Sequence, residues 1–198
     1  MGLEGCVVLH VILLHVFTLS NRRFIVEAYT FQNLYVEQIN ELHGAESLIV
    51  AALPEWLEIT SSEELREEFG FYLQEIKHHI EQLDKILSDL KLSAFPIKNS
   101  TVEGILSQGQ IAAHHGGNSS VKDASLIAIV QRLAHYKMAI YGTARTFARH
   151  LDFNRSMDVL QRCLNEEGEV DRKLTRLAEG GVFTTGINEQ ACKAKAYI

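Results

Sequence analysis

Four long segments of this sequence carry apolar side chains at alternating steps of three and four residues, the spacing of an amphipathic helix. No segment shows the sustained period-two alternation of a β-strand, and only two prolines occur in 198 residues. The sequence therefore predicts an all-α fold. The predicted helices run from about Thr30 to Leu53, from Ser61 to about Leu90, from about Lys122 to Leu151, and from about Arg155 to Glu179.

Proline and capping signals mark the expected helix ends. Pro54 should end the first helix, because proline disfavours helical geometry in the residue before it. Ser61 and Glu64 form a capping-box signal for the second helix, and the same signal opens a short helix from Ser100 to about His114. Two helix pairs joined by this long connection predict a ferritin-like four-helix bundle with one crossover, rather than an up-and-down bundle or a helical solenoid.

The bundle is expected to occupy residues 29–181 as a single domain. Residues 1–28 contain the apolar run 6–19, which is too short for a standard membrane span and lacks the flanks of a secretory signal. We therefore expect an atypical apolar extension there. Residues 182–198 show no periodicity and are expected to form an irregular tail.

Charge and cysteine content narrow the possible partners and location. The net charge is −6 with acids and bases interspersed, which argues against nucleic acid or a membrane surface as a partner. Three cysteines without a Cys-x-x-Cys spacing suggest reduced thiols and a cytoplasmic protein.

Acidic residues occupy positions in the helical stripes where a leucine is expected. Glu46 interrupts the stripe of the first helix, while Glu167 and Asp171 lie four residues apart on the apolar face of the last one. Burying an unpaired carboxylate is costly, so these acids need a partner, a proton or a metal ion.

The second helix adds Glu75 and His79, with His79 on the apolar face. Carboxylates and imidazoles that project into a bundle core are typical ligands of non-haem iron and manganese. We therefore expect a candidate metal site made of Glu46, Glu75, His79, Glu167 and Asp171, which could support iron oxidation or peroxide disposal. No catalytic nucleophile and no organic-cofactor motif is recognisable.

Five blocks of residues stand out along the chain. They are His43-Gly44-Ala45-Glu46 leading to Ala52-Leu53-Pro54, His79-Ile80-Glu81-Gln82-Leu83-Asp84, Ala134-His135-Tyr136 leading to Ala139-Ile140-Tyr141-Gly142-Thr143, Glu166-Glu167 with Asp171 and Leu174, and Leu177-Ala178-Glu179-Gly180-Gly181. In this order, over about residues 31–191, they resemble the bacterial ferritin-like stress proteins of the YciE/YciF type. The resemblance implies a ferritin-like bundle, usually a homodimer, whose helices can hold a two-metal carboxylate site and whose expression is linked to stress.

The third long helix departs from that family. Where the family typically has Glu-His-Tyr-Glu, this chain has Ala134-His135-Tyr136-Lys137, so both acids are missing and one is replaced by a cation. Lys137 could pair with Glu46, Glu167 or Asp171 and neutralise buried acids without metal, at a desolvation cost. Two functions remain open at this point: a stress-associated iron or manganese protein with a degraded site, or a metal-free structural or interaction protein that keeps the bundle and dimer surface.

Overall fold

The computed structural model describes residues 29–95, 97–114 and 117–194, and within these ranges the chain is almost entirely helical. The predicted extension, residues 1–28, lies outside the described residues. The elements are α2 (Phe31–Ile59), α3 (Glu63–Asp89), α4 (Ser100–His114), α5 (Ser119–His150), α6 (Asn154–Glu179), β1 (Gly180–Gly181), β2 (Thr184–Thr185) and α7 (Ile187–Lys193).

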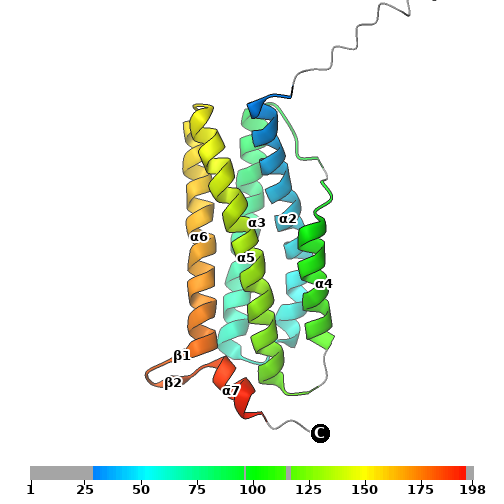
Figure 1. Cartoon of the computed structure of the whole chain (residues 1–198), viewed down its shortest axis with the longest axis vertical. Helices are drawn as coiled ribbons and strands as arrows, with labels where there is room; N and C mark the ends of the chain where they lie inside the picture. Colours follow the sequence, from blue (N-terminus) through cyan, green and yellow to red (C-terminus); the bar gives the residue numbers. More distant parts are fainter. Residues whose placement is uncertain (1–28, 96, 115–116, 195–198) are drawn as a thin grey trace, which may run out of the picture. The chain divides into compact units, whose positions relative to one another are not determined.

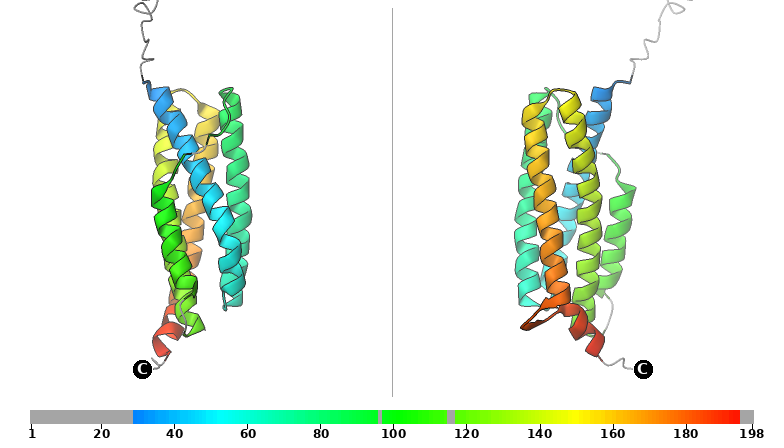
Figure 2. Two further views of the ribbon diagram at one scale, coloured as in Figure 1. Left: turned by 90° about the vertical axis from the view of Figure 1, so that its right-hand side faces the viewer. Right: turned by 60° about the vertical axis from the view of Figure 1, so that its left-hand side comes forward.

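Helices α2, α3, α5 and α6 form the four-helix bundle (Figure 1). Helix α2 runs antiparallel to α3, and α5 runs antiparallel to α6. Between the two pairs, the chain crosses from one end of the bundle to the other through α4, which packs along α2 and α5 (Figure 2). This crossover makes α5 parallel to α3 and confirms the predicted ferritin-like bundle with a short helix in its long connection.

The start of α3 differs from its prediction by one residue. Ser62, not Ser61, caps the helix, because its hydroxyl oxygen accepts a hydrogen bond from the backbone N–H of Leu65 at 3.3 Å. The preceding turn is fixed from across the bundle: the Asp123 carboxylate accepts the backbone N–H groups of Ser61 and Ser62 at 3.0 and 2.8 Å.

The start of α4 was also predicted with the wrong cap. The side-chain oxygen of Asn99 accepts a hydrogen bond from the backbone N–H of Val102 at 3.0 Å, so Asn99 caps the helix in place of Ser100. Helices α3 and α4 therefore each begin at a polar side chain next to the serine that the sequence favoured.

Pro54 lies inside α2, so the prediction that the helix ends there was wrong. Proline removes one N–H donor and strains the preceding turn, which costs stability in a helix interior. On either side of it, however, Leu53 and Trp56 are fully buried and continue the apolar stripe. Their packing offsets the cost, and the helix continues to Ile59.

The predicted irregular tail contains ordered structure. Gly180 adopts a φ of +80°, which a glycine tolerates, and opens the small antiparallel hairpin β1–β2. Beyond the hairpin, α7 packs against α5 and α6 at the end of the bundle. Val182 and Phe183 form the hairpin tip and are 92% and 97% exposed.

The buried residues fall into two apolar clusters that follow one another along the bundle. One contains Ile49, Trp56 and their neighbours, and the other contains Tyr35, Leu83 and theirs. Four charged or titratable residues separate the clusters, and we name them the polar centre: Glu46, His79, Lys137 and Glu167.

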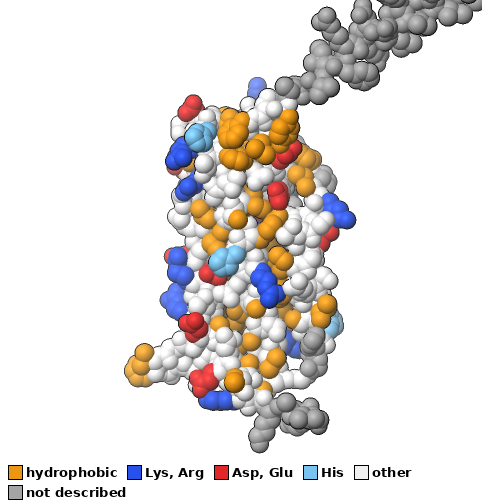
Figure 3. Space-filling model, in the orientation of Figure 1, with side chains coloured by type: hydrophobic (Ala, Val, Ile, Leu, Met, Phe, Trp, Pro, Cys, Tyr) orange, Lys and Arg blue, Asp and Glu red, His pale blue; other side chains and the backbone are white. Residues whose placement is uncertain are grey.

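The exterior fits the mixed charge of the sequence. Acidic and basic side chains are interspersed over the face seen in Figure 3 instead of gathering in one patch of either sign. No helix in the described part of the chain is long and apolar enough to cross a membrane.

Candidate functional site

Each of the four bundle helices contributes one residue to the polar centre. Glu46 comes from α2, His79 from α3, Lys137 from α5 and Glu167 from α6. Their exposed fractions are 0% or 1%, so water does not screen the charges. The helical stripes that the sequence predicts account for this placement, since each residue falls on the inward face of its helix.

Lys137 links the two buried carboxylates. Its ammonium Nζ donates to Oε2 of Glu46 at 2.7 Å and to Oε1 of Glu167 at 2.6 Å. The same ammonium lies 4.8 Å from the centre of the Tyr72 ring, where the face of the aromatic ring attracts a cation. Lys137 therefore forms the predicted ion pairs with Glu46 and Glu167.

The remaining carboxylate oxygens of the polar centre accept hydrogen bonds from two buried tyrosines. Tyr141 donates its hydroxyl to Oε1 of Glu46 at 2.7 Å, and Tyr72 donates to Oε2 of Glu167 at 3.0 Å. Every oxygen of both carboxylates thus has a donor. These hydrogen bonds offset the desolvation cost of burying the two carboxylates.

His79 completes the polar centre and connects it to the bundle surface. Its Nδ1 lies 3.1 Å from Oε1 of Glu46 and 3.5 Å from Oε1 of Glu167. On the other side of the ring, Nε2 lies 2.8 Å from Oε2 of Glu166, whose side chain is 42% exposed. As an imidazolium, His79 donates one hydrogen bond inward and one outward.

The pKa values reflect this pairing. Burial alone would raise the pKa of Glu46, but Lys137 and His79 lower it to about 2. For His79, burial would lower the pKa, whereas hydrogen bonds to Glu167 and Glu46 raise it to about 10. Burial also opposes the charge on Lys137, but Glu167 and Glu46 hold its pKa well above the usual value. Two acidic and two basic side chains therefore face one another in the polar centre.

The structure brings together three of the five predicted ligands. Glu46, His79 and Glu167 each offer one ligand atom within 4.8 Å of the others. Among the described residues, neither Glu75 nor Asp171 joins such a group with them. Glu75 is half-buried, and desolvation raises its pKa.

Asp171 has partners outside the polar centre. One of its oxygens accepts from the Gln131 amide at 3.0 Å and lies 3.3 Å from Nε2 of His135. The pairing of Lys137 with Asp171, one of three alternatives expected from the sequence, therefore does not form.

Sequence reasoning did not assign three other residues to the site. Tyr72 and Tyr141 lie on predicted core stripes and read as packing residues, although tyrosine instead of phenylalanine at a buried position signals a need for a hydrogen-bond partner. Glu166 lies one position off the apolar face of α6 and reaches His79 from the surface side.

The donor set fits an ammonium better than a divalent ion. Lys137 lies within hydrogen-bonding distance of both carboxylates, the position that a bridging metal would need. At an effective dielectric constant of about 20, a dication about 3 Å from an ammonium is repelled by on the order of 10 kcal/mol. Ala134, fully buried one turn before Lys137, offers no carboxylate in compensation. A carboxylate-bridged metal pair therefore does not fit this centre.

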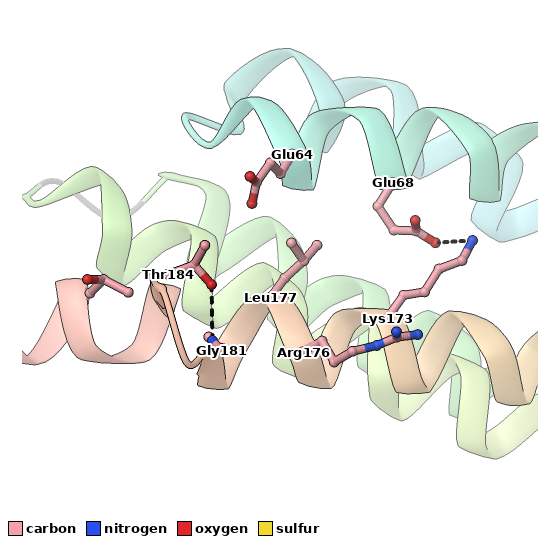
Figure 4. Close-up of a pocket in the computed structure, with 9 residues that line it drawn as sticks. Glu64, Glu68, Lys173, Arg176, Leu177, Gly181 and Thr184 are labelled. Atoms are coloured by element: carbon pink, nitrogen blue, oxygen red, sulfur yellow. Dashed lines mark hydrogen bonds and ion pairs between the residues drawn. The ribbon is translucent and has the colours of Figure 1, made fainter.

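A second region with grouped polar residues lies near the hairpin. A surface pocket of about 550 Å³ is lined by side chains of α3 and α6 and by both strands (Figure 4). Lys173 in this pocket already pairs with Glu68 at 3.1 Å, and Glu64 lines the pocket at its hairpin end (Figure 4). The charges are mixed, and the pocket shares no residue with the polar centre.

Comparisons with known proteins agree with the fold and the sequence blocks. The chain is 30% identical over 161 residues to protein YciF of Escherichia coli K12, a match that covers 81% of this chain and 97% of that protein. The crystal structure of the E. coli stress protein YciF superimposes with a TM-score of 0.72 at 29% identity, covering 76% of this chain and 95% of that one.

A further solved structure, that of YcfI from Rhodopseudomonas palustris, which is proposed to be a structural protein, gives a TM-score of 0.73 at 26% identity. It covers 78% of this chain and 99% of that one. The family model described as a domain of unknown function (DUF892) matches residues 30–190. The chain therefore belongs to the DUF892 family, the ferritin-like stress proteins of the YciE/YciF type.

Proposed function

We propose that this chain is a stress-associated ferritin-like protein in which Lys137 replaces the metal of the bundle core, so that the bundle serves as a metal-independent structural or interaction protein. One observation carries the proposal: the buried ammonium lies 2.7 and 2.6 Å from the two carboxylates that would otherwise hold an ion. The names of two relatives, a stress protein and a proposed structural protein, are consistent with such a role.

Charge balance supports this assignment. Glu46 and Glu167 are compensated by Lys137 and His79, so the folded bundle needs no cation to be neutral at its centre. A ferritin-like redox enzyme uses the opposite arrangement, in which an excess of buried carboxylates requires metal ions. On this proposal the protein is a cytoplasmic homodimer that acts through the contacts its surface makes with other molecules.

The rival function is an iron or manganese protein that oxidises ferrous iron or removes peroxide. Convergence of Glu46, His79 and Glu167 favours it, because carboxylate and imidazole ligands suit these metals. The rival function requires the Lys137 side chain to move out of the polar centre, so that its two carboxylate partners can bind the ion.

Metal analysis of the full chain, purified without chelators from cells supplied with iron and manganese, tests the proposal. We expect well below one ion of iron or manganese per chain. We also expect ferrous iron to be oxidised in air no faster than in buffer alone. Stoichiometric iron or manganese, or iron oxidation whose rate is proportional to protein concentration and saturates with ferrous iron, would establish the rival function.

A further inference from the structure

We propose that His79, Cys163 and Glu166 form a site for one thiophilic divalent cation, with zinc as the chemical type. This site lies on the opposite side of the His79 imidazole from the Lys137 ion pairs. It goes beyond the proposed function, because it uses a thiolate in place of the carboxylate pair and binds an ion without redox chemistry.

The three ligand atoms already lie close together. A ring nitrogen of His79, Sγ of Cys163 and a carboxylate oxygen of Glu166 are all within 4.8 Å of one another, and Nε2 is the His79 nitrogen that faces Glu166. Cys163 and Glu166 are three residues apart on α6 and therefore neighbours on one helix face, while His79 comes from α3. The His79–Glu166 distance of 2.8 Å would open to about 3.4 Å around a tetrahedral zinc ion with bonds of about 2.1 Å.

The polar centre orients His79 for this role. Nδ1 of His79 faces Oε1 of Glu46 at 3.1 Å, so when a bound cation displaces the outward Nε2 proton of the imidazolium, the ring still donates from Nδ1 and presents its Nε2 lone pair to the cation. A carboxylate that accepts from the second ring nitrogen is the usual support of a metal-bound histidine. Lys137 in turn compensates the charge of Glu46.

Cys163 and Glu166 differ in a way that suits a bound ion. Cys163 is a free thiol that is 2% exposed, so its sulfur is shielded from water on the buried side of the proposed site. Glu166, at 42% exposed, provides the route from solvent and leaves room for water in a fourth position. A coordinating thiol loses its proton to the cation's field. Thiolate, imidazole and carboxylate together are a zinc-type ligand set.

Cobalt titration provides the test, because a thiolate bound to Co²⁺ produces a charge-transfer absorption that nitrogen and oxygen ligands do not. The full chain carrying Cys6→Ser and Cys192→Ser has Cys163 as its only thiol and is the starting protein. We expect one Co²⁺ per chain with this absorption, and displacement of the Co²⁺ by Zn²⁺. In that protein, Cys163→Ala should abolish the absorption and weaken binding by more than about 100-fold, beyond the effect of losing an outer-shell partner.

Glu166→Gln supplies a second variant that leaves the apolar core untouched, and Glu169→Gln, an exposed acid on the same helix, is its matched control. Affinity should fall for Glu166→Gln only. If cobalt binds without the charge-transfer absorption, or does not bind, the site does not exist. Equal affinities of the two glutamine variants would remove Glu166 from the site. None of these results depends on iron or manganese content, so they are separate from the test of the proposed function.

Discussion

At the scale of residues, Lys137 is unusual because its charge is fully buried. Lysine is seldom removed from water unless partners surround the ammonium, since desolvation of an ion costs several kcal/mol. Here two carboxylates and one aromatic ring provide those partners. The pairing is therefore interdependent: removing one member leaves the others buried and uncompensated.

Lys137→Met tests this interdependence, because methionine keeps much of the volume and removes the charge. The variant should lower the free energy of unfolding by about 3–5 kcal/mol, the usual cost of breaking a buried ion pair. Urea denaturation measures it. Lys173→Met is the matched control, since Lys173 pairs with Glu68 at the surface and should cost at most about 1 kcal/mol. Similar losses in the two variants would contradict the account of Lys137.

The pH dependence of stability follows from Glu46 and His79. The pKa of Glu46 is lowered from 4.5 to about 2, so its contribution is present above pH 4.5 and is lost as pH falls toward 2. The pKa of His79 is raised from 6.5 to about 10, so its contribution is complete below pH 6.5 and is lost as pH rises toward 10. Stability, measured by urea midpoints across this range, should be greatest between pH 4.5 and 6.5. A loss of stability on passing from pH 4.5 to 6.5 would contradict these assignments.

Sequence pattern located part of the polar centre. Glu46, His79 and Glu167 could be predicted because each interrupts or lies on a helical stripe, and the stripe defines the inward face. Asp171 shares the face of Glu167 but lies one turn further along α6, beside Gln131 and His135. A stripe gives the direction of a side chain but not the residues that meet it from the neighbouring helix, and those depend on tertiary packing.

At the scale of elements, the sequence predicted the helices well and their ends less well. Ser61 and Ser62 both have a hydroxyl that could cap α3. Which of them does so depends on the Asp123 carboxylate, which is distant in sequence and accepts hydrogen bonds from both backbone N–H groups. Pro54 was predicted to end α2 from a local rule, but the burial of Trp56 outweighs that rule. Long-range contacts determine both the start of α3 and the end of α2, so a local sequence pattern cannot predict either one.

The position of α4 depends on a glycine. A Cβ at Gly109 would lie 2.2 Å from Cζ2 of Trp56, which is fully buried and cannot move aside. Gly109→Ala should therefore destabilise the protein by about 1–3 kcal/mol, as overpacking does. Gly104→Ala on the same helix is the matched control, because nothing lies within 4 Å of its added Cβ.

For that control, removal of a mid-helix glycine should raise stability by about 0.5–1 kcal/mol. Urea midpoints of both variants provide the comparison. If Gly109→Ala is as stable as Gly104→Ala, then α4 does not pack on Trp56 as described.

At the scale of the whole molecule, the bundle consists of two apolar clusters with the polar centre between them. The all-α class and the crossover could be predicted from four periodic segments and one long connection. The sequence left open whether metal or Lys137 neutralises the buried acids. The distances from the ammonium to Glu46 and Glu167 favour Lys137, and they depend on how α5 faces α2 and α6, which a sequence pattern does not give.

The most direct test of the claim that Lys137 stands in for metal is to restore the acids that α5 lacks. Ala134→Glu with Lys137→Glu removes the ammonium and adds two carboxylates on the buried face of α5, which together with Glu46 and Glu167 would give an oxygen-rich ligand set suited to manganese or iron. The measurement is the melting temperature of the parent and the double variant, with and without Mn²⁺, or with Fe²⁺ under anaerobic conditions.

An ion at about 100 times its dissociation constant adds about 2.7 kcal/mol to the stability of a folded state that alone binds it. For a chain of this size that corresponds to a rise of about 5–10 °C, which we expect for the double variant and not for the parent. An equal rise in the parent would contradict the claim that Lys137 takes the place of the ion. A double variant indifferent to both metals would show that these four helices do not bring a metal site together.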